Sequence, residues 1–150
     1  MTDENVLHAI PHRPPFLFVD RIVDQGEGRI VTERTYRADE AFFAGHYPGS
    51  PLTPGVLLCE ACFQTGAILL MGAAKTGQSP SGTVPMLTRI QDAKFRNAVL
   101  PGETCRFEIV LDEKMGNAYL MTGKVTSGAK KVLTVQFIVA LIAAEHEGAK

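Results

Sequence analysis

Two kinds of hydrophobic pattern follow each other along the chain. Residues 56–74 form one apolar run in which Glu60 and Gln64 are the strongly polar positions. A run of this length and composition is typical of a helix that is buried on most of its sides. Beyond residue 82 the pattern changes to shorter segments, rich in β-branched and aromatic residues and separated by turn sequences such as "MGN" and "SGA". Such segments at short spacing predict antiparallel strands.

Further elements are expected on both sides of the apolar run. Residues 2–15 predict a short helix, capped by Asp3 or Asn5, that stops before Pro11. Strands are expected at residues 16–24 and 28–37, and after the run at 83–96, 103–114, 117–128 and 130–144. This order predicts an α+β fold, with an antiparallel sheet of about six strands curled around one long central helix. We see no linker, so residues 1–150 are expected to form a single domain.

The segments between these elements carry turn and cap signals. Residues 38–54 are expected to be irregular because they hold several prolines and glycines. At the end of this stretch Thr53 is predicted to be the N-cap of the long helix, with Pro54 at its first helical position. Residues 75–82 predict a polar loop, and the last six residues a polar tail.

Composition and charge narrow the class of protein. The chain has 150 residues, 45% of them hydrophobic, and a net charge of −1, which argues against a nucleic-acid binder. The N-terminus shows no basic and apolar leader, and an odd number of cysteines speaks against a disulfide framework, so the cytoplasm is the expected compartment. Because Glu60 and Gln64 interrupt the apolar run and no basic residues flank it, we interpret it as a core helix rather than a membrane span.

Four residues around the start of the long helix form a candidate site. Glu60 and Gln64 are four residues apart and therefore share one helix face. Gly55 lies in the first turn, where backbone N–H groups have no helical partner, and His46 lies in the preceding loop. A base, an acid, an oxyanion donor and an orienting amide are the groups needed to remove a proton α to a carbonyl. Taken singly, His46 is better explained as a surface or turn residue than as a base, and Gln64 as a structural residue.

The other histidines and the cysteines suggest less. Cys59 and Cys62 form a Cys-x-x-Cys pair, but the pair falls inside the helix and the remaining cysteine, Cys105, lies on a predicted strand. With no second pair to complete a zinc site, we expect no metal and assign the cysteines to packing. His12 is interpreted as a loop hydrogen-bonding residue; the histidines near the two ends, expected to be solvated, are His8 and His146.

Three segments carry a resemblance to a known family. "HRPPFLFVDRI" at 12–22, "FFAGHYPGSPLTPGVLLCEACFQTGAILL" at 42–70 and "KFRNAVLPGE" at 94–103 resemble, in the same order, the β-hydroxyacyl-acyl carrier protein (ACP) dehydratases of fatty acid synthesis, closest to the hydroxymyristoyl-ACP dehydratase type. The resemblance implies the hot-dog fold, a curved antiparallel sheet around one long helix. "ACFQ" and "SPLTPG" depart from the family's usual sequence, at positions that the resemblance assigns to the acyl tunnel.

The resemblance also implies roles for the candidate residues. His46 is the family's catalytic histidine, Glu60 its catalytic acid, Gly55 the residue whose N–H holds the thioester carbonyl, and Gln64 the glutamine after the acid. Glutamate rather than aspartate at position 60 points to dehydration without isomerisation of the double bond. The implied reaction removes water from a (3R)-hydroxyacyl thioester to give a trans-2-enoyl thioester, without a cofactor.

The resemblance also implies partners. These are acyl carrier protein, which brings the acyl-phosphopantetheine substrate, and a second copy of the chain in a homodimer; a trimer of dimers stays open. Candidate docking residues for the acidic carrier are Arg89, Lys94 and Arg96, which are equally explained as solvated strand charges. Three alternatives share the fold: an acyl thioesterase, a (3R)-specific enoyl-CoA hydratase and a non-catalytic acyl-binding module. Acyl chain length stays undetermined.

Overall fold

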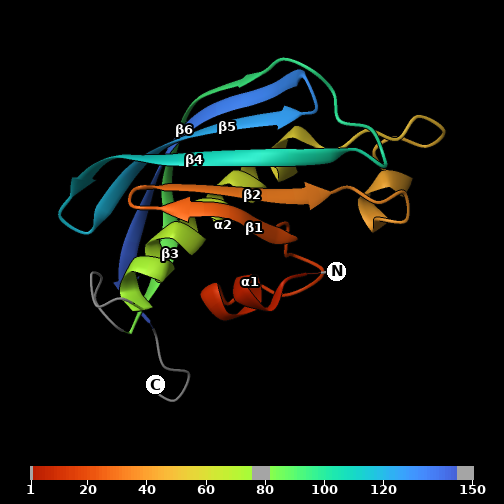
Figure 1. The fold of residues 1–150 in the computed structure, drawn as a ribbon. Helices are drawn as coiled ribbons and strands as arrows, with labels where there is room; N and C mark the ends of the chain where they lie inside the picture. Colours follow the sequence, from red (N-terminus) through yellow and green to blue (C-terminus); the bar gives the residue numbers. More distant parts are fainter. Residues whose placement is uncertain (1, 76–81, 145–150) are drawn as a thin grey trace.

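The long helix lies inside a curved sheet (Figure 1). The computed structural model describes residues 2–75 and 82–144. The helix α2 spans Gly55–Lys75, and the six antiparallel strands are β1 (Arg21–Gly26), β2 (Arg29–Thr35), β3 (Thr83–Phe95), β4 (Thr104–Met115), β5 (Ala118–Ser127) and β6 (Lys130–Ala143). Their order across the sheet is β1-β2-β4-β5-β6-β3. The predicted α+β fold, a sheet of about six strands around one helix, is confirmed.

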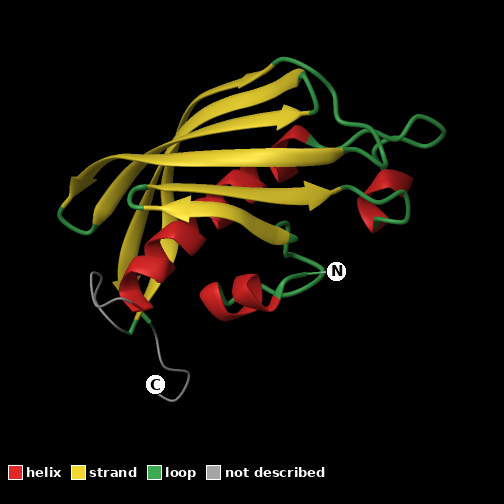
Figure 2. Ribbon diagram, in the orientation of Figure 1, coloured by secondary structure: helices red, strands yellow, loops and turns green. Residues whose placement is uncertain are grey.

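The concave face of the sheet and the helix form one hydrophobic core (Figure 2). Residues 61–70 of α2 are buried without interruption, and they include Cys62 of the Cys-x-x-Cys pair and the polar Gln64. By length and composition Gly55–Gly72 would suffice to cross a membrane, yet 67% of this stretch is buried within the domain. Its apolar composition is therefore explained by its place at the centre of the fold.

The N-terminal segment differs from expectation after its first helix. The helix α1 spans Glu4–Ala9, and the Asp3 carboxylate caps it by accepting from the Asn5 N–H at 2.9 Å, as predicted. The first strand was predicted at residues 16–24, but β1 begins only at Arg21. The backbone of residues 16–18 instead bonds to a side chain of α2, which holds it away from a sheet neighbour.

The start of α2 also differs from expectation. The helix begins at Gly55, and the carbonyl of Pro54 accepts the N–H groups of Leu57 and Leu58. The predicted cap at Thr53 is wrong, because its Oγ1 makes no hydrogen bond although the residue is only 4% exposed. Its backbone N–H donates instead to Val99 O at 2.9 Å, which draws Thr53 towards the segment after β3.

The strand β3 forms one edge of the sheet and carries an unusual number of exposed apolar side chains. It pairs with β6 alone, so its other edge is open. Met86, Leu87, Ile90 and Phe95 are all exposed on this strand, and Val56 at the start of α2 is 73% exposed. A long apolar edge of this kind is a template for pairing with another chain.

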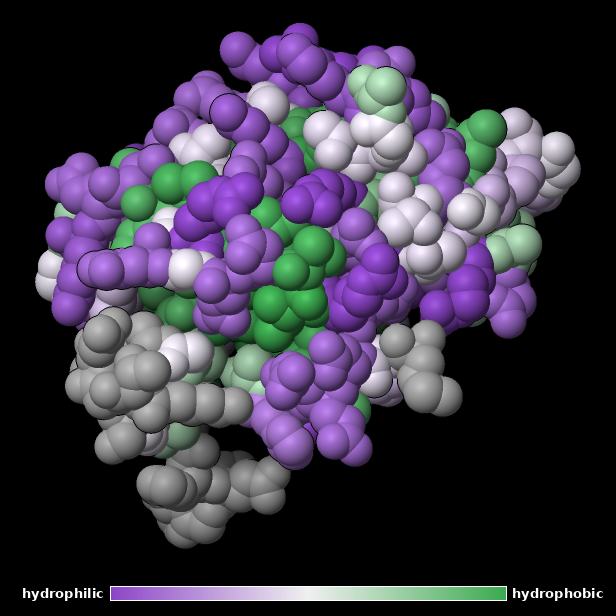
Figure 3. All heavy atoms as spheres, viewed as in Figure 1, coloured by the Kyte–Doolittle hydropathy of each residue, from purple (hydrophilic) through white to green (hydrophobic). Residues whose placement is uncertain are grey.

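A second apolar region lies on the opposite side of the sheet. Figure 3 shows hydrophobic residues near the middle of the face seen in Figure 1. Here a cavity of about 320 Å³ is lined by residues of α1, β1 and α2, among them Ala9, Ile22 and Ile68. The cavity marks where the short N-terminal helix covers the end of the core incompletely.

Candidate active site

His46 is held in one orientation by its own loop. The loop follows the 3-10 helix η1 (Ala41–Ala44), and the His46 N–H donates to Phe42 O at 3.0 Å. The ring Nδ1 lies 2.7 Å from Leu52 O, and the Leu52 N–H returns a bond to His46 O at 2.9 Å. A carbonyl oxygen only accepts, so Nδ1 carries the hydrogen and Nε2 of the neutral ring keeps a free lone pair. The ring of Tyr47 stacks on it at 4.1 Å.

Glu60 faces an apolar pocket from the second turn of α2. A cavity of about 140 Å³ is lined by Glu60 and Gln64 together with His12, Phe63, Ala67, Pro85, Leu87 and Val139. Burial raises the pKa of the Glu60 carboxyl, and the hydrogen bond from Gln64 partly opposes this by favouring the charged form. The arrangement favours a carboxyl that keeps its proton at higher pH than usual and is able to donate it.

Gln64 connects Glu60 to the N-terminal segment. Its Nε2 donates to Glu60 Oε2 at 3.1 Å and to Phe16 O at 3.2 Å, and its Oε1 accepts from the Phe18 N–H at 2.8 Å. The Gln64 side chain is 1% exposed, so these bonds satisfy the polar atoms of an amide that water does not reach freely. The predicted shared face of Glu60 and Gln64 is present, and the amide fixes where the carboxyl points.

Gly55 opens a second cavity at the N-terminus of α2. This cavity of about 350 Å³ is lined by Thr53 and Gly55, by Leu52 and Leu58, and by the segment Phe95–Val99. The N–H of Gly55 finds no acceptor in residues 2–75 and 82–144. A Cβ at this position would lie 2.8 Å from the Phe95 ring, so glycine is required for the ring to pack here. The result is a free backbone donor at the positive end of a long helix.

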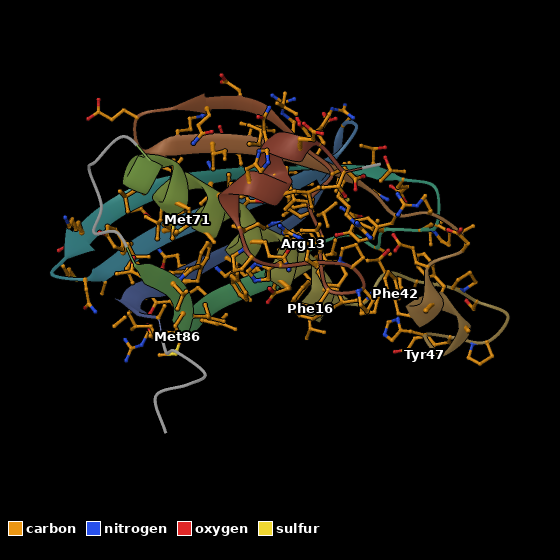
Figure 4. The ribbon with its side chains drawn as sticks, turned by 90° about the horizontal axis from the view of Figure 1, so that it is seen from below. Arg13, Phe16, Phe42, Tyr47, Met71 and Met86 are labelled. Carbon is orange, nitrogen blue, oxygen red and sulfur yellow. The ribbon has the colours of Figure 1, made fainter. Side chains whose placement is uncertain are left out.

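His46, Gly55 and Glu60 line no common cavity within the described residues of one chain. The cavity at Gly55 and the cavity at Glu60 share no lining residue, and His46 lines neither of them. Figure 4 shows Tyr47, the neighbour of His46, towards one end of the molecule and Phe16, whose carbonyl binds Gln64, nearer its middle. Within one chain the candidate residues therefore form two separate groups, which we call half-sites. One holds Glu60 and Gln64, and the other holds Gly55 and the loop of His46, which Leu52 connects by lining the Gly55 cavity and bonding to the His46 ring.

Known proteins with this sequence pattern have a common activity. Residues 10–136 match the FabA-like domain family. The 3-hydroxyacyl-acyl-carrier-protein dehydratase FabZ of Herpetosiphon aurantiacus is 40% identical over 116 residues, which cover 75% of this chain and 78% of the relative. FabZ of Anaeromyxobacter sp. is 33% identical over 148 residues, covering 98% and 94%. The chain belongs to the FabA-like family of 3-hydroxyacyl-acyl-carrier-protein dehydratases. The predicted resemblance is confirmed.

Solved structures confirm the hot-dog fold of this dehydratase. The dehydratase heterocomplex ApeI:P from Xenorhabdus doucetiae superposes with a TM-score of 0.80, at 14% identity and with 91% and 90% of the two chains covered. A hypothetical thioesterase from Streptococcus pneumoniae, solved with coenzyme A, superposes with a TM-score of 0.64, at 10% identity and 95% coverage of both chains. The fold is thus shared by dehydratases and thioesterases, and the sequence relatives distinguish between the two activities.

The cysteines of the dehydratase are packing residues in the structure. Cys59, Cys62 and Cys105 are all buried and free. Burial raises the pKa of each thiol, that of Cys105 to about 12, so none is a reactive thiolate at neutral pH. Within the described part of the chain no group of three His, Cys, Asp or Glu side chains is placed to hold a metal ion.

Two residues near the half-sites were missed or misassigned from sequence. His12 lines the Glu60 cavity, and its Nδ1 is buried without a hydrogen-bond partner, so its interpretation as a loop hydrogen-bonding residue is wrong for this atom. Burial and the neighbouring Arg13 lower the pKa of His12. His8 is exposed as expected, and His146 lies outside the described residues.

The second residue is the buried Arg34 of β2. It is 4% exposed, binds both carboxylate oxygens of Glu40 at 2.8 and 2.6 Å, and donates to Leu17 O at 3.0 Å. Glu40 directly precedes η1, while Leu17 lies between the two residues that Gln64 binds. The guanidinium therefore joins the loop that carries His46 to the segment that positions Glu60. No sequence signal marked this role, because charged strand residues are usually solvated.

Proposed function

We propose that this dehydratase removes water from (3R)-hydroxyacyl thioesters carried by acyl carrier protein, giving trans-2-enoyl thioesters in fatty acid synthesis. Nε2 of His46 takes the α-proton. The electron pair of the broken C–H bond forms the double bond while the Cβ–O bond breaks. Glu60 gives its proton to the departing hydroxyl, which leaves as water. Hydration is the same sequence in reverse.

One observation carries this proposal: the surroundings favour a proton acceptor at His46 and a proton donor at Glu60. The bond to Leu52 O leaves Nε2 of His46 as an acceptor, whereas burial raises the pKa of Glu60 and favours its protonated, donating form. An elimination requires such a base and such an acid. The free N–H of Gly55 then supports the developing enolate oxygen, a contact worth roughly 3 kcal/mol in the transition state.

Acyl carrier protein is the proposed macromolecular partner. The relatives that share the sequence are named for carrier-bound substrates. Arg89, Lys94 and Arg96 are exposed on or just after β3, and Arg96 also lines the cavity at Gly55. Basic residues along β3, with Arg96 in the cavity wall, suit an acidic carrier whose phosphopantetheine arm enters that cavity. We place the enzyme in the cytoplasm, where its three thiols would stay reduced.

A homodimer in which two chains complete each site follows from the two half-sites. The open apolar edge of β3 supports a second copy that covers it. Under a two-fold axis, the His46 and Gly55 half-site of one chain would face the Glu60 half-site of the other. Each dimer then contains two equivalent sites, and neither chain is active alone.

Mixing inactive variants tests the shared site. His46→Ala and Glu60→Ala chains, each inactive alone, are unfolded together and refolded. Half of the dimers should be mixed, and each mixed dimer has one intact site, so activity should return to roughly a quarter of wild type. If both residues act within one chain, mixing restores nothing. Size-exclusion chromatography on the refolded material establishes that it is dimeric or larger.

Paired assays test the reaction and its carrier. Hydration of crotonoyl and longer enoyl thioesters, each on acyl carrier protein and on CoA, is followed by the loss of enoyl absorbance. We expect turnover with the carrier-protein thioesters and no release of free thiol. Free thiol would indicate a thioesterase, and a preference for CoA would indicate an enoyl-CoA hydratase.

A further inference from the structure

The hydroxyl of Thr53 is a buried polar group without a partner. The residue is 4% exposed, and its Oγ1 makes no hydrogen bond to any described residue. Leaving a buried hydroxyl unpaired is unfavourable, and most such groups in proteins are satisfied by protein or solvent. Two other buried threonines show how such hydroxyls are usually satisfied, since Thr32 and Thr65 bond to each other at 2.7 Å. The hydroxyl of Thr53 therefore has a free hydrogen-bonding capacity that no described residue uses.

The position of Thr53 indicates where that partner binds. Thr53 and Gly55 line the same cavity of about 350 Å³ at the N-terminus of α2. The N–H of Gly55 is also without an acceptor in the described part of the chain. Two residues with an unpaired donor, the N–H of Gly55 and the hydroxyl of Thr53, thus belong to the wall of one cavity at the positive end of a 21-residue helix.

The rest of the cavity wall specifies the chemistry of the ligand. Leu52, Leu58, Phe95 and Val99 give the wall an apolar part that suits a hydrophobic portion of the ligand, while Arg96 and Asn97 add a polar part. Two donors and no facing carboxylate suit one oxygen that accepts two hydrogen bonds and gains negative charge during reaction. The backbone holds both donors in place, because the Thr53 N–H bonds to Val99 O and its neighbour Leu52 bonds to His46.

We propose that the hydroxyl of Thr53 is a second hydrogen-bond donor, beside the N–H of Gly55, to the carbonyl oxygen of the acyl thioester. The proposal rests on the proposed function and deepens it. The sequence comparison assigned the segment "SPLTPG" to the acyl tunnel, whereas here its threonine acts on the reacting carbonyl. Thr53 then binds the enolate oxygen more tightly than the ground-state carbonyl and contributes to kcat.

An isosteric pair of variants tests the proposal. Thr53→Val keeps the shape of the side chain and removes the hydroxyl, and Thr53→Ser keeps the hydroxyl. We expect Thr53→Val to lower kcat for crotonoyl thioester hydration by about 100-fold with little change in KM, and Thr53→Ser to stay within a few-fold of wild type. The melting temperature of Thr53→Val should be equal to or above that of wild type, because no native hydrogen bond is lost.

Thr32→Val is the matched control. It breaks the buried bond to Thr65, so its melting temperature should fall while kcat stays close to wild type. Wild-type kcat in a folded Thr53→Val protein would overturn the proposal. A second outcome would also overturn it. In that outcome the melting temperature of Thr53→Val falls as that of Thr32→Val does, and Thr53→Ser does not restore kcat. Both losses would then result from a damaged structure.

A binding measurement separates this proposal from the proposed reaction. Butanoyl-CoA and S-butyl-CoA differ in the carbonyl, and neither needs turnover to bind. Calorimetry measures the binding affinity of each ligand. Thr53→Val should weaken the binding of butanoyl-CoA about tenfold more than that of S-butyl-CoA, which is the effect of one hydrogen bond. Equal effects on both ligands, or none on either, would overturn the role of Thr53. If wild type bound butanoyl-CoA with this Thr53 dependence but hydrated no enoyl thioester, the proposed reaction would fail and the carbonyl site would stand.

Discussion

Replacing Gln64 by methionine should destabilise the protein and impair catalysis together. Methionine fills a similar volume, so the change removes three hydrogen bonds without opening a large cavity. The Phe18 N–H, which is buried, loses its acceptor, and such a loss costs about 1–3 kcal/mol. The Phe16 carbonyl is partly exposed, and water should replace its donor at a smaller cost of up to about 1 kcal/mol.

The sum, about 1–4 kcal/mol, is a large part of the roughly 5–15 kcal/mol that stabilises a typical domain. Urea unfolding at a fixed protein concentration measures this loss, and the melting temperature should fall by roughly 2–16 °C. The freed Glu60 carboxyl loses its fixed orientation, which should lower kcat by about 10- to 100-fold. Since the bond from Gln64 lowers the pKa of Glu60, its removal should also shift the alkaline limb of the kcat profile to higher pH.

Gln25→Met is the matched control for this prediction. Gln25 is exposed on β1, and its replacement should change stability by less than about 0.5 kcal/mol. A Gln64→Met protein that matches this control in both urea midpoint and kcat would refute the idea that the amide anchors the N-terminal segment and the acid.

The other two predictions concern Glu60 and the cysteines. Glu60→Gln should lose about 10²- to 10⁴-fold in kcat, because an amide cannot donate the proton, and retention of most of the rate would limit Glu60 to an orienting role. Burial raises the pKa of Glu60 in the folded state, so the protonated carboxyl contributes stability below the unfolded pKa, and this stability is lost as pH rises through the folded pKa. Glu60→Gln stays neutral at every pH. Its melting temperature minus that of wild type should therefore increase from pH 4 to pH 8 in a thermal scan. Cys59→Ala/Cys62→Ala should keep wild-type kcat and lose only about 1–2 kcal/mol in urea unfolding through small cavities; stoichiometric zinc in wild type that disappears in this variant, as measured by elemental analysis, would contradict the assignment of these buried thiols to packing.

Local patterns in the sequence determined the elements and half of the site. The length of the apolar run predicted α2, and turn signals predicted the later strands, because both depend on neighbouring residues. The spacing of Glu60 and Gln64 predicted their contact, which the structure confirms at 3.1 Å, since residues four apart always share a helix face. The motif around His46 identified the family for the same reason: it is read within one short segment.

Contacts between distant segments were decided only by the tertiary structure. The predicted first strand began too early because Gln64, far along the chain, takes the hydrogen bond of the Phe18 N–H. The predicted cap at Thr53 failed because its backbone N–H bonds to Val99 O and its hydroxyl is left unpaired in the wall of a cavity. The sequence also did not predict that β3 pairs with β6 and forms an edge of the sheet. Sequence patterns report which face of an element is apolar, whereas the partner that covers this face is selected by the packing of the whole chain.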